Sequence, residues 1–258
     1  MITPRPNAAA IAALAATLAL APAANALPLL AIGGSQGFLY RINPDTGNTS
    51  LIVDTDSIFP RGLAWNTFDQ TLHTIGFSKQ LLTIDTNTGD VTAAPLLPVD
   101  TISALAFDPS RNQFYAHDIN DDRLYTIDPE TGFASFVANL FDFDGISSLT
   151  YDPDLDTLFA TEIFSDQLLS IDPDTGAVTV VGQTGFFSIE SLALDPVSGK
   201  LFGIDNAADQ LVSIDKLTAQ TTAIAPVSTN IQGLTFIPSP ASATLLALAG
   251  VAASRRRR

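Results

Sequence analysis

Three carboxylates recur at one position of a repeated sequence. Asp118, Glu162 and Asp205 each stand nine residues before an isoleucine that begins a copy of the repeat, and His117 adjoins the first of them. Carboxylates beside exposed aromatic rings can bind a sugar, a cation or a basic peptide. In the alternative interpretation, these acids cap the ends of strands and contact water.

We expect the neighbouring loops to add a cation and aromatic rings to this surface. The residues predicted to bind a ligand are Asp118, Glu162, Asp205, His117, Arg61, Phe59 and Phe186. No residue is assigned a catalytic role, and none is assigned to a metal.

Most catalytic constellations conflict with the sequence. The chain has no cysteine and only two histidines, His73 and His117, so thiol chemistry and a three-histidine metal site are excluded. No Gly-x-Ser-x-Gly segment is present to carry an activated serine. Hydrolysis of a glycoside needs two carboxylates about 5–9.5 Å apart. A hydrolase or lyase of an extracellular carbohydrate or lactone, built on the three carboxylates and His117, stays an alternative.

One acidic turn, Asp152 to Asp156, resembles the beginning of a calcium loop. An EF-hand needs glycine at position 6 and glutamate at position 12, where this chain has Thr157 and Ile163. An EF-hand is therefore excluded, and a looser Ca²⁺ site in a purely structural repeat protein is the second alternative. We expect no other cofactor.

The repeat that spaces these residues occurs five times. Its copies begin 42, 43, 44 and 43 residues apart and read INPDTG, IDTNTG, IDPETG, IDPDTG and IDKLTA, from Ile42, Ile84, Ile127, Ile171 and Ile214. A fixed period of this length indicates a repeat architecture.

Each repeat contains four segments, A to D, with the composition of β-strands. In the third repeat they are predicted at Ile102 to Phe107, Gln113 to His117, Leu124 to Asp128 and Phe133 to Ala138. Asp, Pro and Gly between the segments supply the hydrogen-bond acceptor, the fixed φ and the positive φ that tight turns require. The pattern predicts an all-β protein.

The first and last repeats are incomplete in complementary ways. The chain begins with segments B, C and D at Leu29 to Ile32, Tyr40 to Ile42 and Thr49 to Val53, and it ends with a lone A segment at Ile231 to Ile237. The last segment can therefore complete the first sheet and close a ring. The sequence predicts a five-bladed β-propeller over residues 27–238.

The general layout resembles the WD40-like and YncE-like propeller superfamily. The chain lacks the Gly-His and Trp-Asp pairs of an orthodox WD40 protein. In propellers, the B–C and D–A loops share one face, which is commonly the ligand face. All seven predicted ligand-binding residues belong to that face or its edge.

The propeller region is strongly acidic. It carries all 27 acidic residues but only seven of the twelve basic ones, which gives it a net charge of −20. This charge disfavours nucleic acid and anionic membrane surfaces as partners. It favours cations and basic partners.

Residues 1–26 have the pattern of a secretory signal peptide. Arg5 precedes an apolar run from Ala8 to Ala21, and Ala24-Asn25-Ala26 fits a cleavage site. We expect this segment to form a helix and to be removed on export.

Residues 239–258 complete a second signal pattern. An apolar run from Ala241 to Ala253 is followed by four arginines, and an apolar helix with such a basic end keeps that end cytoplasmic. With the proline tripeptide before it, this tail resembles the PEP-CTERM sorting signal, although Ser239 stands where that family has glutamate. The residues of the predicted signal are Pro238, Ser239, Pro240, Arg255, Arg256, Arg257 and Arg258.

The resemblance implies a partner and a location. PEP-CTERM tails are recognised by exosortase-type membrane enzymes, so the chain is expected at the cell surface or outside the cell after a transient inner-membrane anchor. We expect a binding or scaffold propeller associated with the envelope or the extracellular matrix, with polysaccharide or protein as its ligand.

Overall fold

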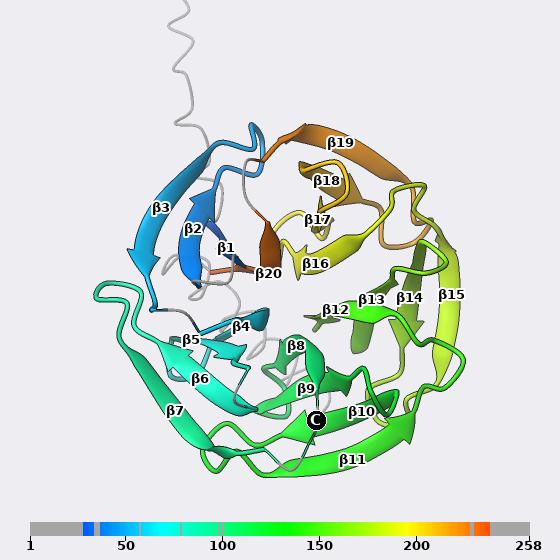
Figure 1. Ribbon diagram of the computed structural model, residues 1–258. Coiled ribbons are helices and arrows are strands. Elements are labelled where there is room, and N and C mark those ends of the chain that lie inside the picture. Colours follow the sequence, from blue (N-terminus) through cyan, green and yellow to red (C-terminus); the bar gives the residue numbers. More distant parts are fainter. Residues whose placement is uncertain are drawn as a thin grey trace, which may run out of the picture.

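The computed structural model describes residues 28–33, 37–56, 58–77, 79–97, 99, 101–227 and 230–237. These residues form twenty strands in five four-stranded antiparallel sheets, arranged around one axis (Figure 1). The five-bladed β-propeller predicted from the repeat is confirmed. The helices predicted for the two signal segments lie outside the described residues.

The first blade combines both ends of the propeller. The order of its strands, from the axis outward, is β20 (Ile231–Phe236), β1 (Leu29–Gly33), β2 (Phe38–Ile42) and β3 (Thr49–Asp54). Leu29 pairs with Phe236 in an antiparallel ladder, as the complementary incomplete repeats required. The ring is thus closed by backbone hydrogen bonds.

The other four blades each use one continuous stretch of chain. The second contains β4 (Arg61–Asn66), β5 (Thr71–Ile75), β6 (Gln80–Ile84) and β7 (Val91–Leu96). The third contains β8 (Ile102–Asp108), β9 (Gln113–Asp118), β10 (Arg123–Ile127) and β11 (Ala134–Asn139). The fourth contains β12 (Ile146–Asp152), β13 (Thr157–Glu162), β14 (Gln167–Ile171) and β15 (Val178–Gln183). The fifth contains β16 (Ile189–Leu194), β17 (Leu201–Asp205), β18 (Gln210–Ile214) and β19 (Thr221–Pro226).

The strand limits differ from the predicted ones by one or two residues. In the third blade, for example, the C strand ends at Ile127, one residue before the predicted end. Asp128 instead caps the turn: its Oδ1 accepts hydrogen bonds from the backbone N–H groups of Glu130 (3.0 Å) and Thr131 (2.8 Å). The carboxylate is needed outside the strand because the turn amides have no strand partner.

The recurring glycine closes this turn. Gly132 has φ +69°, and its N–H donates to the Asp128 carbonyl oxygen at 2.9 Å. The fifth copy has Ala219 at the equivalent position, and it keeps the left-handed conformation with φ +61°. The turn geometry therefore persists where the glycine has been lost.

The hydrophobic core lies between blades. Five clusters of buried residues each draw on two adjacent sheets; one, for instance, packs Leu81 and Ala64 of the second blade against Phe114 and Ile127 of the third. Burial of these side chains is the main favourable term in folding. Every blade is thus stabilised by both neighbours, which fixes the loops of one face relative to one another.

Candidate functional site: the mouth of the axial channel

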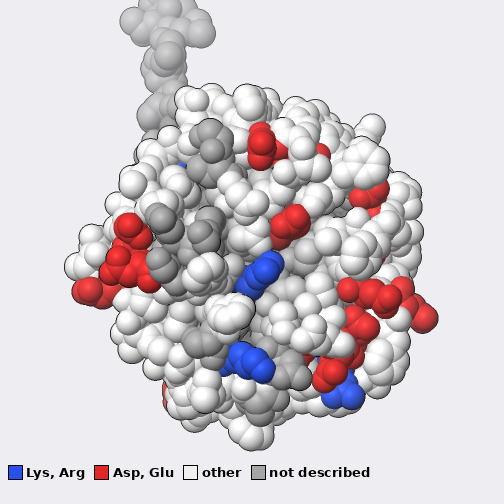
Figure 2. All heavy atoms as spheres, in the orientation of Figure 1, with Lys and Arg blue, Asp and Glu red and all other residues white. Residues whose placement is uncertain are grey.

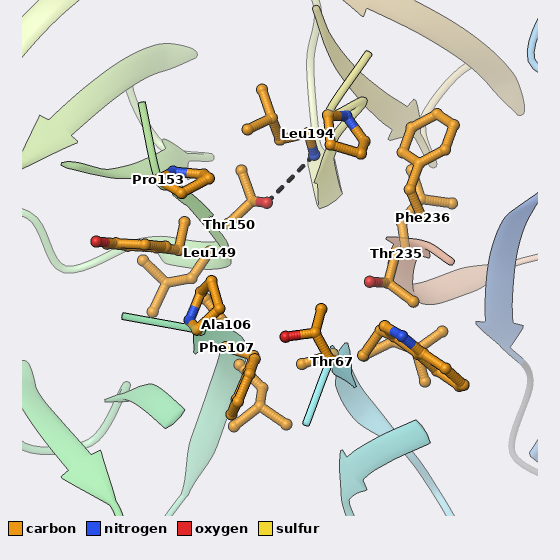
Figure 3. A pocket seen from close by; sticks show the side chains of 17 residues that line it. Thr67, Ala106, Phe107, Leu149, Thr150, Pro153, Leu194, Thr235 and Phe236 are labelled. Atoms are coloured by element: carbon orange, nitrogen blue, oxygen red, sulfur yellow. Dashed lines mark hydrogen bonds between the residues drawn. The ribbon is translucent and has the colours of Figure 1, made fainter. Parts of the chain in front are cut away.

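The B–C and D–A loops form one face of the ring, where the inner strands begin. The blades follow one another anticlockwise in Figure 1 and clockwise in Figure 3, so the two views show opposite faces. Figure 3 looks onto the A–B turns, and Figures 1 and 2 therefore show the B–C/D–A face. On that face, a basic and an acidic side chain lie close together near the centre, and most of the other acidic side chains lie nearer the edges (Figure 2).

The three recurring carboxylates occupy equivalent places at the last residue of their B strands. All three are buried, with exposed fractions of 1% for Asp118, 4% for Glu162 and 3% for Asp205. Their side chains do not extend across the face toward a shared ligand position. They turn back onto the loop that follows each strand and, for Asp118, also onto the D–A loop that contains Thr101.

Backbone amides of those loops bind the carboxylate oxygens. Asp118 Oδ1 accepts from Asn120 N at 3.0 Å and from Thr101 N at 3.2 Å. Asp205 Oδ1 accepts from the N–H groups of residues 207 and 208 at 2.9 and 3.1 Å. Carboxylates placed this way satisfy turn amides that have no strand partner.

Glu162 makes the same kind of cap with a longer side chain. Its Oε1 accepts from Phe164 N at 2.9 Å, and its Oε2 accepts from Ser165 N at 2.7 Å and from the Ser165 hydroxyl. Both oxygens are engaged within the loop. This geometry matches the alternative in which the acids cap strand ends.

His117 is fully buried and its Nδ1 lies 3.0 Å from the Ser103 hydroxyl. Ser103 donates in turn to the Ile146 carbonyl oxygen at 2.8 Å, across the boundary between the third and fourth blades. Burial lowers the pKa of His117 to about 4, so the imidazole is neutral near pH 7. The described contacts of His117 are contacts within the core.

Arg61 begins β4 at the axial end of the face, and its side chain is exposed. Its Nη1 donates to Gln232 Oε1 at 3.0 Å, and Gln232 Nε2 lies 3.3 Å from Glu190 Oε2. These three side chains belong to three different inner strands, β4, β20 and β16. They form a polar chain across the mouth of the channel.

Amide and hydroxyl side chains hold Glu190 in place. Its Oε2 also accepts from Asn206 Nδ2 at 3.1 Å, and its Oε1 accepts from the Ser188 hydroxyl at 2.6 Å. Asn206 in turn bonds the backbone of Ile231 through both of its amide atoms, at 2.9 and 3.3 Å. We call the set Arg61, Glu190, Asn206 and Gln232 the mouth network.

Aromatic rings are exposed beside the mouth network. Phe59 is 50% exposed and lies 6.1 Å, centroid to centroid, from Phe77, which is 85% exposed. Phe59 also has φ +47°, a strained conformation for a residue with a Cβ atom. Phe186 differs from this pair because it is partly buried against the core of the last blades, whereas Phe187 is 69% exposed.

The channel beneath the mouth is filled by side chains. A cavity of about 10 Å³ remains there, bordered by Glu190, Gln232 and the inner-strand leucines. This space is about that of one water molecule. A ligand on this face would therefore rest on the surface and would not enter the axis.

Many solved structures are similar to this chain, including two at TM-score 0.60. One is a chain in the crystal structure of a nidogen/laminin complex, at TM-score 0.60 and 12% sequence identity, covering 81% of this chain and 97% of that one. The other is a protein of unknown function from Bacteroides thetaiotaomicron VPI-5482, at TM-score 0.60 and 14% identity, covering 83% of this chain and 63% of that one. At these identities the likeness establishes the propeller fold alone. No family model matches the sequence, and no curated protein does.

The described residues also bear on metal binding and on membrane-spanning helices. Within residues 28–237, as far as they are described, no group of three His, Asp or Glu side chains is placed to hold a metal ion. The same part of the chain contains no helix long and apolar enough to cross a membrane. The residues of the predicted sorting signal, Pro238 to Pro240 and Arg255 to Arg258, lie outside it.

Sequence reasoning missed Gln232 and Asn206 as members of this site. Arg61, Ser103, Ser147, Glu190 and Gln232 stand at one repeat position near the start of the inner strands, which was a usable signal. The sequence does not show which of these side chains bond one another, because they belong to different blades and come together only in the closed ring.

Proposed function

We propose that this chain is an exported binding or scaffold propeller whose B–C/D–A face contacts an extracellular polysaccharide or protein. The exposed Arg61 guanidinium carries the proposal, because it has one hydrogen bond among the described residues and retains donors for a ligand. The mouth network holds it in position, and exposed Phe59 and Phe77 lie on the same face. Arginine and aromatic side chains are enriched where binding energy concentrates.

A hydrolase or lyase is the weaker proposal. Such chemistry needs free carboxylates that face a common substrate. The oxygens of Asp118, Glu162 and Asp205 accept hydrogen bonds from their own loops, and His117 is enclosed in the core. Arg61, Phe59 and Phe77 offer contact surface without an acid–base pair.

The two sequence signals support export and surface processing. We propose that residues 1–26 direct secretion and that the tail recruits an exosortase-type enzyme, with a transient membrane anchor and a final location at the cell surface or in the matrix. The mass of the exported protein tests both cleavages at once. A mass that retains residues 241–258 would contradict processing of the tail.

A binding screen tests the ligand face. The wild-type chain would be applied to a glycan array and to extracellular protein from the producing cells. Arg61→Ala and Phe77→Ala should each weaken any captured ligand at least about tenfold if they are hot spots. Phe68→Ala is the matched control, since this ring is also exposed, at 63%, but belongs to an A–B turn of the opposite face. Equal losses in all three variants would contradict the assignment of the face.

A further inference from the structure

The opposite face contains an apolar funnel at the axis. The C-terminal ends of the five inner strands line it, and it encloses about 110 Å³ (Figure 3). Its walls include Trp65, Phe107, Tyr151, Leu194 and Phe236, one from each blade. Leucines of the same strands form part of the lining. The funnel is thus lined mainly by hydrocarbon and aromatic surface.

Apolar side chains continue from the funnel onto the A–B turns. Phe68 is 63% exposed, Leu155 48% and Val197 72%. Each stands one or two residues after a residue that lines the funnel: Thr67, Pro153 or Pro196. A connected apolar region of this kind marks a binding surface on a soluble protein.

The turns around this region are acidic. Asp69, Asp154 and Asp156 are exposed in the A–B turns, and exposed aspartates of the C–D turns stand farther out. Of the basic residues of this face, Arg111 and Lys216 are paired with aspartates, and the exposed Lys200 is outnumbered by the exposed aspartates of the turns. An occupant with an apolar part and a cationic end is therefore the best match.

The chain itself supplies such a segment at this place. Phe236 lines the funnel, and the propeller ends with Ile237. Three further residues span at most about 10 Å, so the apolar run of 241–253 starts within reach of the funnel. Four arginines follow that run at 255–258.

We propose that the funnel binds the chain's own C-terminal segment, residues 241–258. Its leucines, Leu245, Leu246 and Leu248, would enter the apolar funnel, and the arginines would contact the acidic turns. The propeller would thereby cover its own apolar tail until the tail is inserted into the membrane or cleaved off. This concerns the face opposite the proposed ligand surface, so either proposal can fail while the other stands.

Engineered cysteines test the contact, and the cysteine-free chain is a clean background. Thr67→Cys lies on the funnel, and Phe77→Cys lies exposed on the opposite face. Each would be combined with Leu246→Cys in the full chain and oxidised at low protein concentration. A disulfide requires the two Cα atoms within about 7 Å. We expect an intrachain disulfide in the Thr67 pair alone; equal yields in both pairs, or a disulfide only between chains, would overturn the proposal.

Trp65 provides a second readout, because it is the only tryptophan of the chain and lines the funnel. Replacing Leu245, Leu246 and Leu248 by Asp should move its emission to longer wavelength as water enters. Both variants are made in the unprocessed full chain, where replacing Leu14, Leu18 and Leu20 of the N-terminal apolar run by Asp is the matched control and should leave the emission unchanged. An emission shift in the control alone would assign the funnel to the N-terminal segment and overturn the proposal.

A membrane surface is the competing occupant of the funnel, and vesicles of anionic lipid test it. The acidic turns disfavour an anionic membrane surface. If vesicles move the Trp65 emission of the tail variant back to shorter wavelength, the funnel faces lipid and the proposal is wrong. An unchanged emission supports a funnel that is selective for the tail.

Discussion

At the scale of single residues, the recurring acids of this protein bond backbone amides, and its histidines bond hydroxyl groups in the core. Asp118, Glu162 and Asp205 bond loop amides, and the two histidines lie in the core. A polar group is buried at low cost only when a partner satisfies it. His73 meets this condition through Thr71, whose hydroxyl lies 2.6 Å from Nε2, and its ring lies 4.9 Å from that of Phe114.

The histidines predict an acid-sensitive fold. Burial lowers the pKa of both His73 and His117 to about 4 from 6.5, so the unfolded chain binds protons that the folded chain does not. Stability is fully present above pH 6.5 and is lost as the pH falls toward 4. Between pH 7.5 and pH 5 each histidine should cost about 2 kcal/mol of the free energy of unfolding.

Urea denaturation across this pH range measures the effect. A variant with His73→Gln and His117→Gln serves as the control, because its stability should change much less between pH 7.5 and pH 5. The window stays above the usual pKa range of carboxylic acids. An equal pH dependence in wild type and variant would contradict the assignment to histidine.

At the scale of elements, the inner strands are packed against one another around the axis. Gly62 of β4 has φ +66°, and a Cβ atom built on it would lie 2.6 Å from the backbone nitrogen of Leu105 on β8. A Cβ on Gly233 of β20 would lie 2.6 Å from the Gly62 carbonyl carbon. With only five blades, the circle formed by the inner strands is narrow, so neighbouring inner strands lie this close together.

Gly62→Ala should therefore be strongly destabilising. The left-handed backbone costs an alanine about 1 kcal/mol, and the clash with the next strand should raise the total to about 3 kcal/mol or more. Gly185→Ala is the matched control, since its φ is +71° but nothing lies within 4 Å of the added atom. Chemical denaturation of the two variants would separate the cost of the left-handed backbone from the cost of the clash with the next strand. Equal losses in the free energy of unfolding would contradict the clash.

Ion pairs join the A–B turns of adjacent blades. Arg111 of the third blade bonds Asp156 of the fourth through both guanidinium nitrogens, at 2.7 and 3.1 Å, and lies 3.1 Å from Asp174. It also bonds the buried Asp108 at 2.8 Å. A bidentate pair within a network is stronger than an isolated surface pair.

Arg111→Ala should lower stability by about 1–2 kcal/mol, because two blades lose a shared cation beside a buried carboxylate. Arg123→Ala is the control, since Arg123 pairs at 3.2 Å with the exposed Asp121 of its own blade and should have little effect. Thermal unfolding at low and high salt measures both variants. A loss for Arg123→Ala as large as that for Arg111→Ala would contradict an inter-blade role.

At the scale of the whole molecule, one strand closes the ring. β20 pairs with β1 on one side and packs beside the inner strands β4 and β16. Without it, β1 has a free edge, and the core between the first and fifth blades loses Leu234 and Phe236. Propellers depend on closure because their blades are stabilised by their neighbours.

Ending the chain after residue 229 should therefore abolish cooperative unfolding and cause aggregation, since it leaves an unpaired strand edge. Ending it after residue 238 removes the tail but keeps β20, and this control should unfold in one transition. Calorimetry and size-exclusion chromatography compare the two. A folded monomer from the shorter chain would contradict the closure argument.

The sequence alone determined the number and kind of blades. The period near 43 residues, the four β segments and the complementary ends are local patterns, and local patterns specify strands and turns. The degenerate copy IDKLTA also forms the predicted turn. The N–H groups of Asp215 and Ala219 make the same backbone hydrogen bonds as their equivalents in the other copies. Only the strand limits shifted, by one or two residues.

The tertiary structure alone decided what the side chains at those positions do. Asp118, Glu162 and Asp205 were placed at equivalent loops by spacing, but the direction of a carboxylate depends on which amides its own loop leaves unpaired. The mouth network joins Arg61, Gln232 and Glu190, which are up to 171 residues apart in sequence. The funnel likewise needs five strand ends in one place, and only ring closure brings them together.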